Sequence, residues 1–115
     1  MPPGCHPLGP ANKLTLAAGL LAGSPCPCSG RISAGAKSPL TLGIKESNAG
    51  GIAAQKMARL GVRALVIEDQ PDRGWHLLRV SADGAKLSRR DDLAGLDNAA
   101  ILARLRSEFG PQVAI

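Results

Sequence analysis

The clearest pattern of hydrophobic and polar positions lies in residues 48–68. Within residues 52–60, apolar side chains recur at helical spacing at Ala53, Met57 and Leu60. The polar side chains of Gln55, Lys56 and Arg59 would lie on the opposite face of such a helix. Gly61 follows, as glycine commonly does where a helix ends. The apolar run 64–67 then predicts a buried strand. We therefore expect residues 48–51 to form a loop, 52–60 a helix and 62–68 a strand.

The carboxyl-terminal part predicts a hairpin and a second helix. Residues 75–80 and 85–87 flank Asp83-Gly84, a dipeptide that readily adopts the positive φ of a hairpin turn. Asp97-Asn98 is typical of a helix cap, and Gly110-Pro111 of a helix end. The apolar positions between them share one helix face: Ile101, Leu102, Leu105 and Phe109. Residues 112–115 read as the first half of a strand.

The amino-terminal part is rich in proline and glycine, which interrupt its helices and strands. Residues 1–11 predict an irregular lead-in, because the first ten residues hold four prolines and two glycines. Strands are expected at 13–18 and 31–37, separated by a proline- and glycine-rich loop at 19–30, with a turn at Leu42-Gly43. The prediction is one α+β domain over residues 12–115, with a mixed β-sheet and two main helices.

Composition narrows the range of functions. The 115 residues carry a net charge of +5, which favours an anionic partner. No basic run exceeds two residues, and Trp75 and Phe109 are the only aromatic side chains, so a base-stacking surface for nucleic acid is not expected. The start of the chain lacks a secretory signal, and the longest apolar stretch, at 14–22, is too short to span a bilayer. We expect a soluble cytoplasmic protein that binds neither nucleic acid nor membrane.

Three cysteines invite a metal interpretation that their spacing does not support. Cys26 and Cys28 form C-x-C rather than the usual C-x-x-C, and Cys5 lies in the irregular lead-in. Two ligands do not hold a zinc ion or an iron–sulfur cluster. The sequence alone therefore assigns no metal ligand and favours loop cysteines with no special role.

Two segments are candidates for binding an anion. In Asn48-Ala-Gly-Gly51, two glycines before a helix would let a phosphate approach free backbone N–H groups, although a capped helix with a flexible start explains the same residues. In Ser29-Gly-Arg31, a guanidinium follows directly on a loop and could grip an anion, or could be an ordinary surface arginine. Lys37 and Lys45 could add charge to this region or be solvated. No residues form a self-sufficient catalytic site.

Read together, four ordered blocks resemble the amino-terminal domain of aldehyde:ferredoxin oxidoreductases. The blocks are Leu8-Gly-Pro-Ala-Asn-Lys-Leu14, Gly23-Ser-Pro-Cys-Pro-Cys-Ser-Gly-Arg31, Ala36-Lys-Ser-Pro-Leu-Thr41 and Gly43-Ile-Lys-Glu-Ser-Asn-Ala-Gly-Gly51. The resemblance continues through residues 54–61 and 66–68. Leu42 departs from it, since family members commonly have glycine there, and Ala11 replaces a common acidic residue.

The resemblance implies oxidation of aldehydes to carboxylic acids by a tungsten bis-pterin cofactor, with electrons passing through a [4Fe-4S] cluster to ferredoxin. It places pterin contacts on Arg31, Asn48 and Gly50, the positions that the residues themselves suggest for anion binding. The cysteines that ligate the cluster have no counterpart here, so we expect a fragment that contributes part of the cofactor pocket. Activity would then need the remaining domains of the enzyme, and a homodimer is conceivable.

A second hypothesis is a non-catalytic anion- or pterin-binding module, or a remnant, that depends on a separate chain for activity. Neither the particular aldehyde nor the choice between tungsten and molybdenum follows from these residues.

Overall fold

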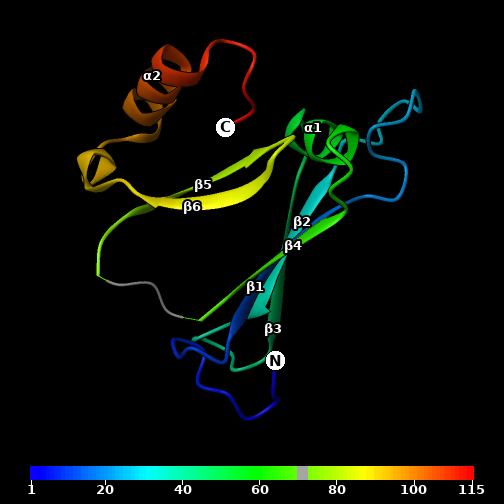
Figure 1. Ribbon diagram of the computed structural model, residues 1–115. Coiled ribbons are helices and arrows are strands. Elements are labelled where there is room, and N and C mark those ends of the chain that lie inside the picture. Colours follow the sequence, from blue (N-terminus) through cyan, green and yellow to red (C-terminus); the bar gives the residue numbers. More distant parts are fainter. Residues whose placement is uncertain (70–72) are drawn as a thin grey trace. The chain divides into compact units, whose positions relative to one another are not determined.

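The computed structural model describes residues 1–69 and 73–115 and divides the chain into two compact units, Met1–Pro71 and Asp72–Ile115 (Figure 1). The first unit contains β1 (Lys13–Ala18), β2 (Ile32–Lys37), β3 (Ile44–Ala49), α1 (Ala53–Arg59) and β4 (Ala64–Glu68). The second contains β5 (His76–Ser81), β6 (Gly84–Arg89), the short 3-10 helix η1 (Asp91–Leu93) and α2 (Asn98–Phe109).

The first unit is built on a four-stranded antiparallel sheet in the order β3-β2-β1-β4. Because side chains alternate along a strand, the pairing separates two faces. One face carries mainly apolar residues: Leu14, Leu16, Ala34, Ala36, Leu65 and Ile67. The other is largely polar: Lys13, Thr15, Ser33, Glu46, Asn48 and Glu68. Glu68 and Lys13, partners across β1 and β4, form an ion pair on that polar face.

Helix α1 follows β3 and contacts β1, and it supplies two of the most buried side chains of the unit, Ala54 and Met57. The helix ends at Arg59, Leu60 is its C-cap, and the next residue, Gly61, has a φ of +79°. Such a left-handed conformation strains most side chains but not glycine. The amphipathic spacing thus predicted both the helix and its end.

The turn between β2 and β3 is closed by two backbone hydrogen bonds, from Ser38 to Gly43 at 2.8 Å and from Leu42 to Ser38 at 2.9 Å. Leu42 has a φ of +58°, a conformation that non-glycine residues rarely adopt. A glycine at this position would adopt the same backbone conformation without strain.

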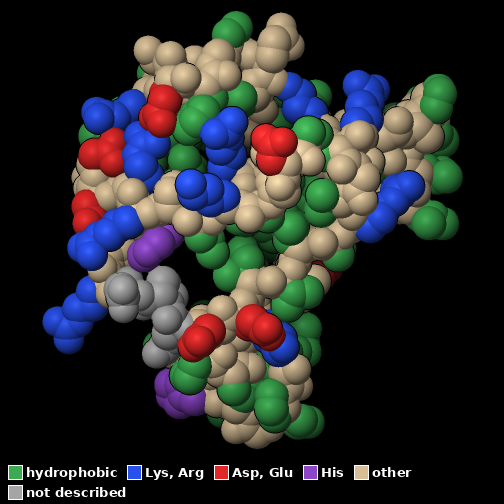
Figure 2. Space-filling model, in the orientation of Figure 1, with side chains coloured by type: hydrophobic (Ala, Val, Ile, Leu, Met, Phe, Trp, Pro, Cys, Tyr) green, Lys and Arg blue, Asp and Glu red, His purple; other side chains and the backbone are tan. Residues whose placement is uncertain are grey.

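The second unit consists of the β5–β6 hairpin followed by η1 and α2. Asp97 caps α2, since its side chain accepts a hydrogen bond from the backbone N–H of Ala100 at 2.8 Å. Leu93 and Leu105 are the buried apolar residues, and the Arg79 guanidinium lies 5.2 Å from the centre of the Phe109 ring. On the visible face in Figure 2, basic and acidic side chains of this unit are interspersed.

The α+β prediction is confirmed, with both helices and the hairpin, and the pairings within the described residues are all antiparallel. Two local predictions were wrong. Residues 48–49 belong to β3 rather than to a loop, because pairing with β2 extends the ladder that far. Residues 112–115 form no strand, since no neighbouring strand pairs with them in the described part of the chain.

Candidate functional site

The two segments proposed to bind an anion meet at one end of the sheet. Ile32 pairs with Ala49 and Ser33 with Asn48, so the residues just before β2 approach those just after β3. The backbones come so close that a Cβ atom built on Gly30 would lie 2.6 Å from the carbonyl oxygen of Gly51. Only glycine fits at position 30 without a shift of the backbone.

The side chain of Gln55 in α1 forms hydrogen bonds that stabilise this close approach of the segments 29–31 and 48–51. Its Oε1 accepts a hydrogen bond from the Gly23 backbone N–H at 2.7 Å, and its Nε2 donates to the Ser29 hydroxyl at 3.1 Å. Ser29 in turn donates to the carbonyl oxygen of Cys26 at 2.8 Å. One helix side chain therefore holds both ends of the loop that leads to Arg31. No signal in the sequence marked this role for Gln55.

The backbone after β3 is open. Gly51 has a φ of +111°, which side chains rarely tolerate, and a Cβ atom on Gly50 or Gly51 would meet no atom within 4 Å. A ligand could therefore approach this stretch of main chain closely, as binding loops rich in glycine allow.

Arg31 stands beside this open backbone with its charge uncompensated. Its carbonyl oxygen accepts a hydrogen bond from Gly19 N–H at 3.1 Å, which fixes the main chain, while the side chain is exposed. Within residues 1–69 and 73–115, Arg31 takes part in no ion pair and no side-chain hydrogen bond. A guanidinium in this state can bind an anion without first breaking another contact.

Asn48 lies on the polar face of the sheet in a small network. The Ser33 hydroxyl oxygen is 2.7 Å from both Glu46 Oε1 and Asn48 Oδ1. A hydroxyl carries one proton and can donate to only one of these acceptors at a time. The exposed Asn48 amide therefore retains hydrogen-bonding capacity for a ligand.

The structure corrects one part of the anion-site prediction and decides between the two alternatives left open for Lys37 and Lys45. Asn48 does not begin α1: it lies inside β3, and the seven-residue helix starts after Ile52 without a side-chain cap. Lys37 and Lys45 do not reinforce Arg31 either. They lie at the opposite end of β2 and β3, roughly 15 Å or more along the strands at about 3.3 Å per residue.

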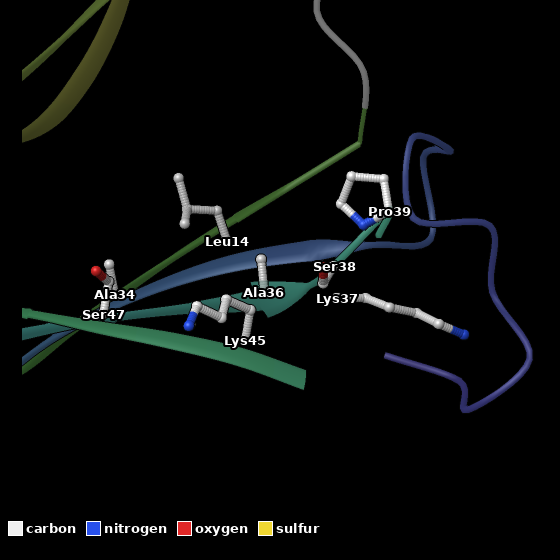
Figure 3. A pocket seen from close by; sticks show the side chains of 9 residues that line it. Leu14, Ala34, Ala36, Lys37, Ser38, Pro39, Lys45 and Ser47 are labelled. Atoms are coloured by element: carbon white, nitrogen blue, oxygen red, sulfur yellow. The ribbon is translucent and has the colours of Figure 1, made fainter. Parts of the chain in front are cut away.

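A separate hollow of about 270 Å³ opens on the apolar face of the sheet (Figure 3). Leu14, Ala34, Ala36, Pro39 and Lys45 are among the residues that line it. Figure 3 shows the Lys37 side chain running outward from it, in agreement with the hydrogen bond from Lys37 Nζ to the carbonyl oxygen of Pro3. Arg31, Asn48 and Gly50 lie outside this hollow.

Three acidic side chains of the second unit are engaged in ion pairs: Asp91, Asp92 and Glu108. Arg90 pairs with Asp92 at 2.8 Å and with Glu108 at 2.9 Å. The hydrogen bond from Arg90 lowers the pKa of Asp92, and the Trp75 backbone N–H together with Arg89 lowers the pKa of Asp91. Both carboxyl groups stay ionised near neutral pH, which suits a structural rather than an acid–base role.

Neither a metal cluster nor a membrane span is seen in the described residues. No three His, Cys, Asp or Glu side chains of residues 1–69 and 73–115 are grouped closely enough to hold a metal ion. No helix in that part of the chain is long and apolar enough to cross a bilayer.

Comparison with known proteins identifies the family. A family model described as "Aldehyde ferredoxin oxidoreductase, N-terminal domain" matches residues 1–115. The chain belongs to the aldehyde ferredoxin oxidoreductase family. The resemblance of the four sequence blocks is thereby confirmed.

Two curated relatives carry the name tungsten-containing aldehyde ferredoxin oxidoreductase. The protein from Pyrococcus furiosus is 40% identical over 112 residues, and that from Thermococcus kodakarensis is 31% identical over 110 residues. These alignments cover 97% and 96% of this chain but 18% of each relative. The chain thus spans less than a fifth of the length of these enzymes.

A solved structure supports the fold. It is described as the active site complex BamBC of benzoyl coenzyme A reductase in complex with 1,5-dienoyl-CoA. It matches with a TM-score of 0.90 at 25% sequence identity, covering 97% of this chain and 17% of that one. The α+β arrangement therefore recurs within a much larger protein.

Proposed function

We propose that this chain forms one wall of a tungsten-pterin pocket and that, joined to the remaining domains of an aldehyde ferredoxin oxidoreductase, it serves the oxidation of aldehydes with ferredoxin as electron acceptor. The observation that carries the proposal is the junction of Ser29–Arg31 with Asn48–Gly51. In this junction three groups share one end of the sheet: the Arg31 guanidinium, which has no ion pair among the described residues, the Asn48 amide and an open glycine backbone. The relatives named as tungsten-containing enzymes support the choice of cofactor.

The residues at this end of the sheet fit the chemistry of a phosphorylated pterin. Arg31 offers a planar, permanently charged fork of donors that suits phosphate oxygens. Asn48 offers an amide, and Gly50 leaves the main chain accessible to a bulky group. When bound, the tungsten-pterin would supply the redox chemistry, and this chain would orient the cofactor and neutralise its charge.

The other requirements of the reaction fall to the remaining domains. We assign the [4Fe-4S] ligands, the aldehyde channel and the ferredoxin contact to them, because the cysteines of this chain are not at the positions of the cluster ligands. The chain alone would then bind the cofactor weakly and catalyse nothing.

The test is a chimera in which this segment replaces the matching amino-terminal part of the Pyrococcus furiosus relative. Tungsten and released pterin per polypeptide are measured after production in a tungsten-supplied host. The chimera should be loaded, and Arg31→Ala should lower both contents together. Arg59→Ala, which removes an exposed arginine at the end of α1, is the matched control and should leave loading unchanged.

Full tungsten and pterin content in the Arg31→Ala chimera would contradict the proposed contact. If the unmutated chimera contains tungsten and pterin but Arg31→Ala and Arg59→Ala lower these contents equally, the loss would reflect the overall positive charge. A specific contact between Arg31 and the cofactor would then be contradicted. A pterin-loaded chimera without aldehyde oxidation would favour the non-catalytic pterin-binding module.

A further inference from the structure

A second site, independent of the proposed function, lies in the loop between β1 and β2. Cys26 and Cys28 are both free and exposed, and only Pro27 separates them. We propose that these two thiols form a two-coordinate site for a soft monovalent cation, Cu⁺ being the probe of choice.

The turn that carries the thiols is fixed in shape. Pro27 restricts its own φ, and Cys28 has a φ of +60°, the combination expected at the two central positions of a type II turn. Hydrogen bonds hold both flanks: Cys26 N–H donates to Ser24 Oγ at 3.2 Å, and Ser29 Oγ donates to the Cys26 carbonyl at 2.8 Å. A preorganised turn lowers the entropic cost of bringing two ligands to one ion.

The Cys26 thiol is directed toward the peptide group that joins Pro27 to Cys28. Cys26 Sγ lies 3.7 Å from the carbonyl oxygen of Pro27, which belongs to the peptide group joined to Cys28. Binding requires the side-chain torsions of Cys26 and Cys28 to bring both sulfur atoms to one ion. Both side chains are exposed, so solvent can deliver the ion and accept the thiol protons.

The ligand count selects the ion. Among residues 1–69 and 73–115, no third His, Cys, Asp or Glu joins these two thiols, whereas a structural Zn²⁺ takes four ligands in a tetrahedral arrangement. Thiolates are soft ligands that favour Cu⁺, an ion that accepts a linear pair of sulfur donors. On binding, each thiol releases its proton to solvent and forms one Cu–S bond, and no electrons are exchanged with the protein.

The chain, reduced and kept anaerobic, is titrated with Cu⁺ in competition with bicinchoninate, and the bound copper is examined by X-ray absorption. One Cu⁺ per chain with two sulfur neighbours is expected, and excess Zn²⁺ should not displace it. Cys26→Ser and Cys28→Ser should each weaken binding at least about 100-fold, because a chelate of two linked ligands is lost. Cys5→Ser, with its thiol in the irregular amino-terminal segment, should bind as the unmutated chain does.

The proposal is overturned if either single serine variant of the pair retains the affinity, or if Cys5→Ser weakens binding as much as they do. One copper per two chains, with dimers in size-exclusion chromatography, would also overturn it. Circular dichroism of each variant separates a lost ligand from a lost fold, since exposed thiols should leave the spectrum unchanged.

Discussion

The tight contact between Gly30 and Gly51 leads to a prediction that needs no cofactor. In Gly30→Ala, the new methyl group would lie 2.6 Å from the Gly51 carbonyl oxygen and 3.1 Å from Gln55 Cγ. The first contact is with backbone and cannot be relieved by a side-chain rotation. The substitution should therefore push apart the two segments that form the candidate site.

The magnitude follows from two opposing effects. Overpacking of this kind typically costs about 1–3 kcal/mol. Replacing glycine by alanine also lowers the conformational entropy of the unfolded chain, which stabilises the folded state by about 0.4–1 kcal/mol. We expect a net loss of about 1–2 kcal/mol in the free energy of unfolding for Gly30→Ala.

Gly50→Ala is the matched control, because a Cβ atom there meets nothing within 4 Å and the residue lies outside the left-handed region. It should be neutral or stabilising by up to about 1 kcal/mol. Urea denaturation followed by circular dichroism measures both variants. Equal stabilities for Gly30→Ala and Gly50→Ala would refute the close approach of the two segments.

Two further predictions concern the second unit. Asp97→Ala removes the cap that accepts the Ala100 N–H and should lower stability by about 1 kcal/mol, measured by thermal denaturation with Asp97→Asn as the tolerated replacement. The pKa values of Asp91 and Asp92 are lowered in the folded chain, so their contribution to stability is present above pH 4 or so and is lost as the pH falls through their folded pKa values. The stability difference between the unmutated chain and Asp92→Asn should shrink toward zero in acid, and a difference independent of pH would contradict this assignment.

The elements with a clear local signal could be predicted from the sequence. The spacing of Ala53, Met57 and Leu60 defined α1, and Asp83-Gly84 defined the β5–β6 turn. The end of β3 could not be predicted, because Asn48 and Ala49 join the strand through pairing with β2, and this pairing depends on residues far away in the chain. The absence of a strand after Gly110 has the same origin, since a strand needs a partner.

The candidate site shows a similar division. Arg31, Asn48 and Gly50 could be singled out because their residue types and the family resemblance point to anion binding. Gln55 and Gly30 could not, since their importance comes from contacts across 26 and more positions in the sequence and from a backbone distance. The sequence left open whether Lys37 and Lys45 add charge to the site or are solvated, and strand register, which carries them to the other end of the sheet, favours the second alternative.

The most direct test of the central claim is an experimental structure of the tungsten-loaded chimera. The account predicts a pterin phosphate within hydrogen-bonding distance of the Arg31 guanidinium. The cofactor would lie over Gly50, at the end of the sheet where β2 begins and β3 ends. A cofactor seated instead in the apolar hollow beside Leu14 and Lys45, with Arg31 free in solvent, would contradict it.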